Sequence, residues 1–156
     1  MIEVRTATIT DCKALAELRW EFRSVQSQPA ETHDAFVRRC AVWMRRELPS
    51  GGAWKAWVAI DTHVVVGQVW LQVVQKIPNP SAAVESEQLA YLSNLYVKVA
   101  ARGGTGTRLL EAALEWCRAN RIDRVVLWPS KRSVTLYLGH GFSHGGDVME
   151  LPIRRS

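Results

Sequence analysis

The chain lacks the cysteine pattern of a disulfide-stabilised protein. Its three cysteines, Cys12, Cys40 and Cys117, are odd in number and lie far apart. Small secreted domains instead carry an even number of cysteines at characteristic spacings. We therefore interpret these residues as reduced thiols and expect a cytoplasmic protein. The N-terminal segment MIEVRTATITD agrees with this, because it lacks the apolar core of a secretory signal.

Long apolar runs and metal-binding spacings are also missing. No apolar run approaches the ~18 residues that a membrane-spanning helix needs. The four histidines show no zinc spacing. His140 and His144 are four residues apart, but the glycines around them oppose the helix that would bring both rings to one face. We expect neither a membrane segment nor a bound metal.

A basic excess is present, but it is spread along the chain. Lys and Arg number 20 against 15 Asp and Glu, a net charge of +5. Such a surplus attracts nucleic acid or a small polyanionic cofactor. The densest basic residues, Arg38-Arg39 and Arg45-Arg46, are interpreted as the solvated face of a helix. Basic and aromatic residues do not alternate as they do in base-stacking proteins, so we expect no nucleic-acid partner.

The composition is that of one folded domain. The 156 residues are 47% hydrophobic and 22% charged, which suffices for a core and argues against disorder. No repeat or linker divides the chain, so residues 1–156 are predicted to form a single domain. Seven tryptophans indicate large aromatic wedges in its core.

Periodicity and turn residues predict the element order β α α β β β α β α β. The expected elements are a strand at Ile2–Thr8, helices from Thr10 or Asp11 to Val25 and from Thr32 or Asp34 to Leu48, strands at Trp54–Ile60, Val64–Gln75 and Leu89–Val97, a helix from Thr105 or Thr107 to Asn120, a strand at Arg124–Trp128, a helix at Ser133–His140 and an edge strand at Asp147–Ile153. We expect an α/β (α+β) fold with a mixed, mostly antiparallel central sheet flanked by helices. One parallel pair should join the strands on either side of the third helix.

The stretch Asn94–Leu110, NLYVKVAARGGTGTRLL, carries the strongest functional signal. A strand runs into a loop with three glycines, and a helix follows at once. Glycine lets the backbone approach a ligand closely, and a helix N-terminus offers unpaired N–H groups to an anion such as a pyrophosphate. The signal is weak by itself, since most such turns are only turns. The dinucleotide pattern G-x-G-x-x-G and the P-loop pattern are both absent.

Together with the later stretch Leu136–Phe142, LYLGHGF, this pattern resembles the GNAT-type N-acyltransferase superfamily. The two motifs stand in the right order and are separated by one helix and one strand. The resemblance covers nearly the whole chain and implies an acyltransferase that uses acetyl-CoA and needs no metal. It implies transfer of the acetyl group to a primary amine, which attacks the thioester directly.

The resemblance also implies which residues hold acetyl-CoA. Backbone N–H groups of the glycine loop would bind the pyrophosphate, with Arg102 beside them. The backbone of Val97 would bind the pantetheine amides, and the N–H of Leu95 would stabilise the oxyanion of the thioester carbonyl. The full expected set is Leu95, Tyr96, Val97, Arg102, Gly103, Gly104, Thr105, Gly106, Thr107, Ser130, Ser133 and Tyr137.

The sequence departs from the family pattern at three places. Ala101 stands where the family has Gln or Arg, and Arg102 follows one residue late. Ser130 and Ser133 replace a usual asparagine and alanine; each could bind the cofactor or simply cap a helix. Many members carry an acidic base on the fourth strand, but here the candidate positions hold Tyr91 and Asn94, and no carboxylate is apparent there.

Two side chains are candidates for the chemistry. By the resemblance, Tyr137 would protonate the leaving thiolate; otherwise it is a core aromatic. Glu21 on the first helix could deprotonate the amine; otherwise it is a solvated carboxylate. Cys117 is not expected to be a nucleophile, because it falls on the apolar face of its helix and buried thiols are usually inert.

The acceptor is the part that the sequence leaves open. We expect a small-molecule amine, in a pocket made by the first two helices, the Pro78–Glu87 loop and the last strands. Two alternatives remain: a CoA-binding regulatory domain without turnover, and an acetyltransferase acting on an RNA-borne or protein amine. A homodimer is common among proteins of this kind.

Overall fold

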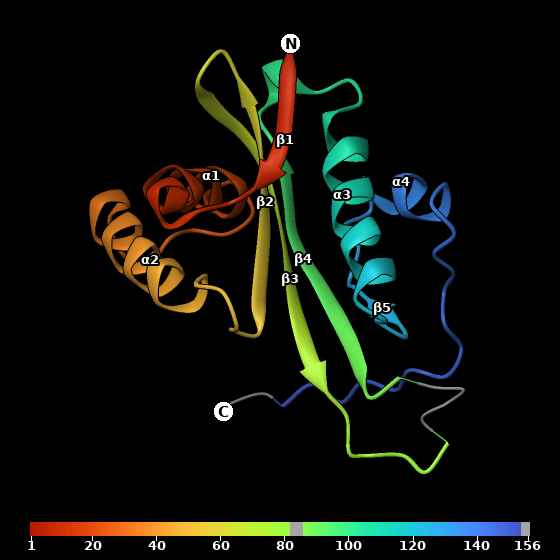
Figure 1. Cartoon of the computed structure of the whole chain (residues 1–156). Helices are drawn as coiled ribbons and strands as arrows, with labels where there is room; N and C mark the ends of the chain where they lie inside the picture. Colours follow the sequence, from red (N-terminus) through yellow and green to blue (C-terminus); the bar gives the residue numbers. More distant parts are fainter. Residues whose placement is uncertain (82–85, 154–156) are drawn as a thin grey trace.

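A five-stranded sheet in the order β1-β2-β3-β4-β5 forms the middle layer of the molecule (Figure 1). The structure is a computed structural model that describes residues 1–81 and 86–153. The strands are β1 (Ile2–Thr6), β2 (Trp54–Asp61), β3 (Val64–Gln75), β4 (Gln88–Val97) and β5 (Val125–Val126). All neighbours are antiparallel except β4 and β5, which are parallel. The predicted mixed, mostly antiparallel sheet is confirmed.

Helices cover both faces of this sheet (Figure 1). One face carries α1 (Cys12–Ser24) and α2 (His33–Glu47), and the other carries α3 (Thr105–Ala119). The short helix α4 (Val134–Leu138) and two 3-10 turns, η1 (Ile9–Asp11) and η2 (Val99–Ala101), complete the described elements. Among these, no helix combines the length and apolar character needed to cross a membrane.

Alternation along the strands divides the interior into two hydrophobic clusters. On β3, Val69 and Leu71 belong to the cluster under α3, whereas Trp70 belongs to the cluster under α1 and α2. Successive side chains of a strand point to opposite faces, so a single valine-rich strand supplies both cores. The polar side chain of Gln68 is fully buried under α1: it donates to the Leu15 carbonyl at 3.1 Å and accepts from Trp70 Nε1 at 2.8 Å.

Local signals explain how the elements begin and turn. Thr32 caps α2 by accepting from the N–H of Ala35 at 3.2 Å. Thr62 and His63, both at positive φ, make the two-residue turn between β2 and β3, as tight hairpins require. The predicted elements from β1 to α3 are all present, and their ends shift by at most a few residues.

The C-terminal part differs from the prediction. The expected strand at Arg124–Trp128 pairs only at Val125 and Val126, and the expected helix at Ser133–His140 is shorter. The expected edge strand at Asp147–Ile153 was wrong, because these residues form no ladder. A strand needs the edge of another strand to pair with, and the edge that β5 provides is only two residues long. In addition, Pro152 lacks the N–H that a ladder hydrogen bond uses.

Candidate active site

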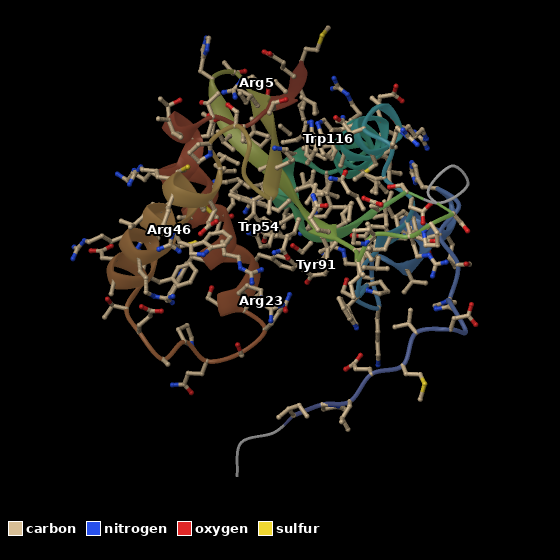
Figure 2. All side chains as sticks on the ribbon, turned by 60° about the horizontal axis from the view of Figure 1, so that its bottom comes forward. Arg5, Arg23, Arg46, Trp54, Tyr91 and Trp116 are labelled. Atoms are coloured by element: carbon tan, nitrogen blue, oxygen red, sulfur yellow. The ribbon has the colours of Figure 1, made fainter. Side chains whose placement is uncertain are left out.

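A cleft opens where β4 and β5 part. The two strands pair at Ala90–Val125 and Tyr91–Val126, and the N–H of Asp123 donates to the Gln88 carbonyl at 3.1 Å. Beyond Tyr91, no described strand pairs with β4 on that side. The resulting cleft of about 1240 Å³ runs from α1 and α2 to the N-terminus of α3. Figure 2 shows three of its lining residues, Arg23 of α1, Trp54 of β2 and Tyr91 of β4, around one central region of the view.

A β-bulge at Asn94 turns the backbone of β4 toward this cleft. Gln68 and Trp70 of β3 face Tyr96 and Ser93, so β4 has one extra residue there, and Asn94 takes the left-handed φ of 57°. The N–H of Ala90 points to the β5 side, where it bonds Arg124 O at 2.9 Å.

The extra residue changes which residues of β4 direct their backbone N–H and C=O groups toward β3 and which direct them toward the cleft. The N–H of Lys98 points to the β3 side and bonds Val66 O at 2.8 Å, although Lys98 and Ala90 are an even number of residues apart. After the bulge it is therefore Leu95 and Val97 whose N–H and C=O groups face away from β3. Both residues line the cleft.

The glycine loop ends this open strand in a helix N-terminus. Gly103 and Gly104 have φ values of 114° and 105°, and Gly104 is the N-cap of α3. Thr105 Oγ1 donates to Ala101 O at 2.6 Å, which ties the loop to η2. The first N–H groups of α3 have no acceptor within the helix and open toward the cleft, which Gly104, Gly106 and Thr107 line.

Arg102 is folded back along β4. Its Nε donates to the Val97 carbonyl at 3.0 Å, and its guanidinium carbon lies 6.0 Å from the centre of the Tyr96 ring. This hydrogen bond uses one lone pair of the Val97 carbonyl oxygen and does not involve the Val97 N–H. Arg102 lines the cleft, so its remaining guanidinium N–H groups lie beside the glycine loop.

Tyr137 of α4 lies in the cleft with its hydroxyl unpaired among the described residues. The side chain is 7% exposed and packs against Phe142 with ring centres 5.5 Å apart. No described side-chain N or O atom is both fully buried and without a partner, so the Tyr137 hydroxyl reaches the cleft. Burial raises the pKa of Tyr137 to about 12, so the phenol stays protonated at neutral pH.

The two predicted serines lie at the same mouth of the cleft, just before α4. Ser130 Oγ and Ser133 Oγ are 2.9 Å apart, and Ser133 Oγ also contacts Ser130 O at 3.1 Å. They line the cleft together. The two hydroxyls share a hydrogen bond. Both oxygens can still accept a hydrogen bond from a molecule in the cleft.

Glu21 is placed differently from the other candidates, because it is not among the residues that line the cleft. Its carboxylate is 3.3 Å from Lys98 Nζ and accepts a hydrogen bond from the Tyr96 hydroxyl at 3.4 Å. The neighbouring Phe22 stacks on Tyr96 with ring centres 5.2 Å apart. Glu21 and Phe22 thus fix Tyr96, which lies between Leu95 and Val97.

The thiols are poorly suited to attack. Cys117 is buried on α3, and burial raises its pKa to about 11. Burial also raises the pKa of Cys12 and of Cys40. Among the residues that the structure describes, no three His, Cys, Asp or Glu side chains come together as metal ligands.

The sequence predicts a pocket at the first two helices and suggests Trp43 and Trp70 as aromatic walls, but it did not single out the arginines at this end of the cleft. Arg19 and Arg23 project there from α1, and an aromatic wall forms behind them from Trp43, Trp54 and Trp70. The described part of the Pro78–Glu87 loop does not line the cleft, and residues 82–85 lie outside the described residues. Helical spacing places Arg19 and Arg23 on one face of α1, but no sequence signal shows which strand that face meets.

A sequence model of the acetyltransferase (GNAT) family matches residues 13–142 of the chain. A GCN5-related N-acetyltransferase from Ralstonia eutropha JMP134 is 25% identical with a TM-score of 0.78, over 98% of this chain and 99% of that one. A protein from Clostridium acetobutylicum, described as a predicted acetyltransferase with acetyl-CoA, is 17% identical with a TM-score of 0.78, over 97% of this chain and 96% of that one.

The glucosamine-6-phosphate N-acetyltransferase of Arabidopsis thaliana is 17% identical with a TM-score of 0.70, over 99% of both chains. Among curated proteins, none matches this chain significantly.

Proposed function

The chain belongs to the acetyltransferase (GNAT) family, and on that premise we propose that it moves the acetyl group of acetyl-CoA to a primary amine by direct attack. One observation carries the proposal: the unpaired edge of β4 and the N-terminus of α3 face the same cleft. An open strand edge suits an amide-bearing chain, and a helix N-terminus suits a pyrophosphate.

We assign the cofactor contacts as follows. The N–H groups of Gly104, Gly106 and Thr107 bind the pyrophosphate, and Gly103 and Thr105 shape the loop that presents them. The close approach is possible because Gly106 presents no side chain to the cleft.

The remaining proposed contacts come from β4 and from the residues just before α4. The N–H of Val97 binds a pantetheine carbonyl, and Arg102 adds charge beside the phosphates. Tyr96 anchors β4 to α1 through its contacts with Glu21 and Phe22. Ser130 and Ser133 contact the cofactor from the opposite wall, where they line the cleft.

Acetyl-CoA supplies an activated thioester. The Leu95 N–H points at its carbonyl oxygen and stabilises the negative charge that develops there. Tyr137 donates its proton to the departing sulfur, and burial keeps that proton on the phenol by raising its pKa to about 12. Glu21 acts by positioning Tyr96, to which it is hydrogen-bonded, and the amine loses its proton to water in the cleft.

Titration calorimetry with acetyl-CoA, followed by thiol release over a panel of amines, tests the proposal. We expect binding in the micromolar range and release of CoA with at least one class of amine. Binding without transfer to any amine, including peptide N-termini and aminoacylated RNA, would identify a CoA-binding domain without turnover. No binding at all would contradict the proposal as a whole.

A further inference from the structure

Arg19 carries a charge in the cleft that nothing in the described protein balances. Its Nη1 donates to the neutral Asn94 Oδ1 at 3.2 Å, and no described carboxylate pairs with it. The groups that act on it electrostatically are Arg23, Cys40 and Tyr91, and burial together with Arg23 lowers the pKa of Arg19. A partly desolvated cation without a partner is unfavourable. Such residues concentrate at functional sites.

The other two arginines at the α1–α2 end of the cleft differ in whether a carboxylate pairs with them. Arg23, one helical turn along α1, lines the same cleft and also lacks a described carboxylate partner. Arg39 lines it too, but it is bound to Glu31 through its guanidinium. Of the three arginines on α1 and α2 that line the cleft, Arg19 and Arg23 thus leave N–H donors for an anion, and both lie on one side of α1. Arg102 and Arg132, which follow β4 and β5, also line the cleft.

Behind these arginines the cleft is apolar. Trp43 of α2 lies with its ring centre 5.3 Å from that of Trp54 and 5.9 Å from that of Trp70. Phe36 and Met44 extend this wall. Aromatic rings of this kind bind a large apolar group and do not stabilise a negative charge.

Resting on the proposed acetyl transfer, we infer that the acceptor is an α-amino acid with a large apolar side chain. Arg19, assisted by Arg23, binds its carboxylate, and the tryptophan wall receives its side chain. A planar guanidinium suits a carboxylate, which it can bind through two parallel hydrogen bonds.

The position of Arg19 explains why the carboxylate should adjoin the amine. Its partner Asn94 is the bulge residue immediately before Leu95, whose N–H faces the open side of β4. A carboxylate on Arg19 therefore lies close to the reacting carbonyl, as the α-amino acid geometry requires.

The reaction balances without any further reagent. The neutral α-amine forms a bond to the acetyl carbon, and the bond from that carbon to sulfur breaks. One amine proton leaves to water, and the thiolate takes a proton from Tyr137, which water replaces. The products are the N-acetylated amino acid and CoA.

The test compares each amino acid with its decarboxylated amine. The pairs are phenylalanine with 2-phenylethylamine, tryptophan with tryptamine, and leucine with 3-methylbutylamine, at equal free-amine concentrations. We expect kcat/KM to favour the amino acid by about tenfold or more, because the decarboxylated amine leaves the half-buried charged donor Arg19 unpaired. Arg19→Gln should abolish this preference, Arg19→Lys should keep part of it, and Arg23→Gln should reduce it.

Arg39→Gln is the matched control, since Arg39 already has a carboxylate partner, and it should leave the preference unchanged. Retained acetyl-CoA affinity and melting temperature show that each variant is folded. Equal or better turnover of the decarboxylated amines overturns the inference. It is also overturned if the protein acetylates other amines but acetylates none of the amino acids. An equal loss for both members of a pair in Arg19→Gln also overturns it, because Arg19 would then only position the bulge. Failure of the proposed function differs from all of these, since no amine of any class would be acetylated.

Discussion

The two ends of the cleft are built in different ways. The end at α3 is made largely of backbone: the open N–H groups of β4, the loop at Gly103 and Gly104, and the first turn of a helix. The end at α1 and α2 is made of side chains, among them Arg19 and Trp43. Backbone groups present the same chemistry whatever side chains surround them. A cofactor site of that kind can persist while the acceptor site changes residue by residue.

The difference predicts how each end responds to substitution. At the α3 end, added bulk should do harm, and loss of a side chain should matter little except at Arg102 and Tyr137. At the acceptor end, side-chain identity should decide which amine reacts, while the affinity for acetyl-CoA should stay the same.

The largest effect should come from Gly106→Val. A Cβ at Gly106 would meet only Leu136 and Val97, at 3.9 and 4.0 Å, which are ordinary contacts. The domain should therefore fold, but the branched side chain would stand between the helix N-terminus and the phosphates. Losing one or two charge-assisted hydrogen bonds should weaken acetyl-CoA binding by on the order of a hundredfold, measured by calorimetry.

Gly106→Ala is the graded control for this variant. Its single methyl fits the structure equally well, so acetyl-CoA affinity should lie between that of the wild type and that of Gly106→Val. Gly104 is less informative, because its φ of 105° would strain any other residue. Unchanged affinity in a folded Gly106→Val protein would show that the pyrophosphate binds elsewhere.

Tyr137→Phe should have the next largest effect and should act on turnover alone. The ring that packs against Phe142 is kept, so acetyl-CoA affinity should stay within about twofold, while kcat falls ~10- to 100-fold through loss of the general acid. Stopped-flow or coupled thiol release measures it. A wild-type rate in the variant would make Tyr137 a core aromatic and solvent the source of the proton.

The pH dependence offers a second test of Tyr137. Burial raises its pKa to about 12, above the ordinary value near 10. The phenol thus stays protonated up to pH 10, and kcat should not fall between pH 8 and pH 10. The raised pKa stabilises the fold fully below pH 10, and this stabilisation is lost as the pH rises toward 12. Tyr137→Phe should therefore lose less stability than the wild type between pH 10 and pH 12.

The sequence predicted the structure of the α3 end of the cleft far better than that of the α1–α2 end, for a physical reason. Gly103, Gly104 and Gly106 lie close together in the sequence and serve one loop, so their pattern is visible without a structure. Strand alternation and helix periodicity likewise gave the order of elements up to α3. The bulge at Asn94 was not predicted, because nothing but its φ of 57° and the pairing with β3 reveals it.

The side chains that meet at the α1–α2 end could not be grouped from the sequence in the same way. Trp43, Trp54 and Trp70 come from three different elements and meet only after the sheet has formed. The edge strand expected at Asp147–Ile153 failed for a similar reason, since its composition suits a strand but no edge receives it. Both cases depend on contacts between segments distant in the sequence, which propensity does not encode.

Trp43→Leu should have a smaller effect, confined to the acceptor end of the cleft. It shortens the aromatic wall while keeping an apolar residue on α2. The KM for an apolar acceptor should rise about three- to tenfold, the range expected for a few methylene-sized contacts, with acetyl-CoA affinity unchanged within twofold. Steady-state kinetics measures the KM for the acceptor, and calorimetry measures the affinity for acetyl-CoA. A parallel loss of acetyl-CoA affinity would mean that the two ends are not independent.

The smallest effect should come from reversing charge at Arg38 and Arg39. Both side chains are exposed on α2, and Arg39 pairs with Glu31. Substituting both with Glu breaks that surface pair, which is worth about 0–1 kcal/mol, and puts negative charge at the acceptor mouth. Acetyl-CoA affinity should change by less than about twofold at physiological salt, where a Debye length of about 8 Å screens distant charges. An anionic acceptor should show a modest rise in KM, about twofold, that shrinks further at 0.5 M salt, whereas a neutral amine should show none. A large, salt-sensitive loss of acetyl-CoA affinity would place the CoA phosphates beside α2 and join the two ends of the cleft into one electrostatic site.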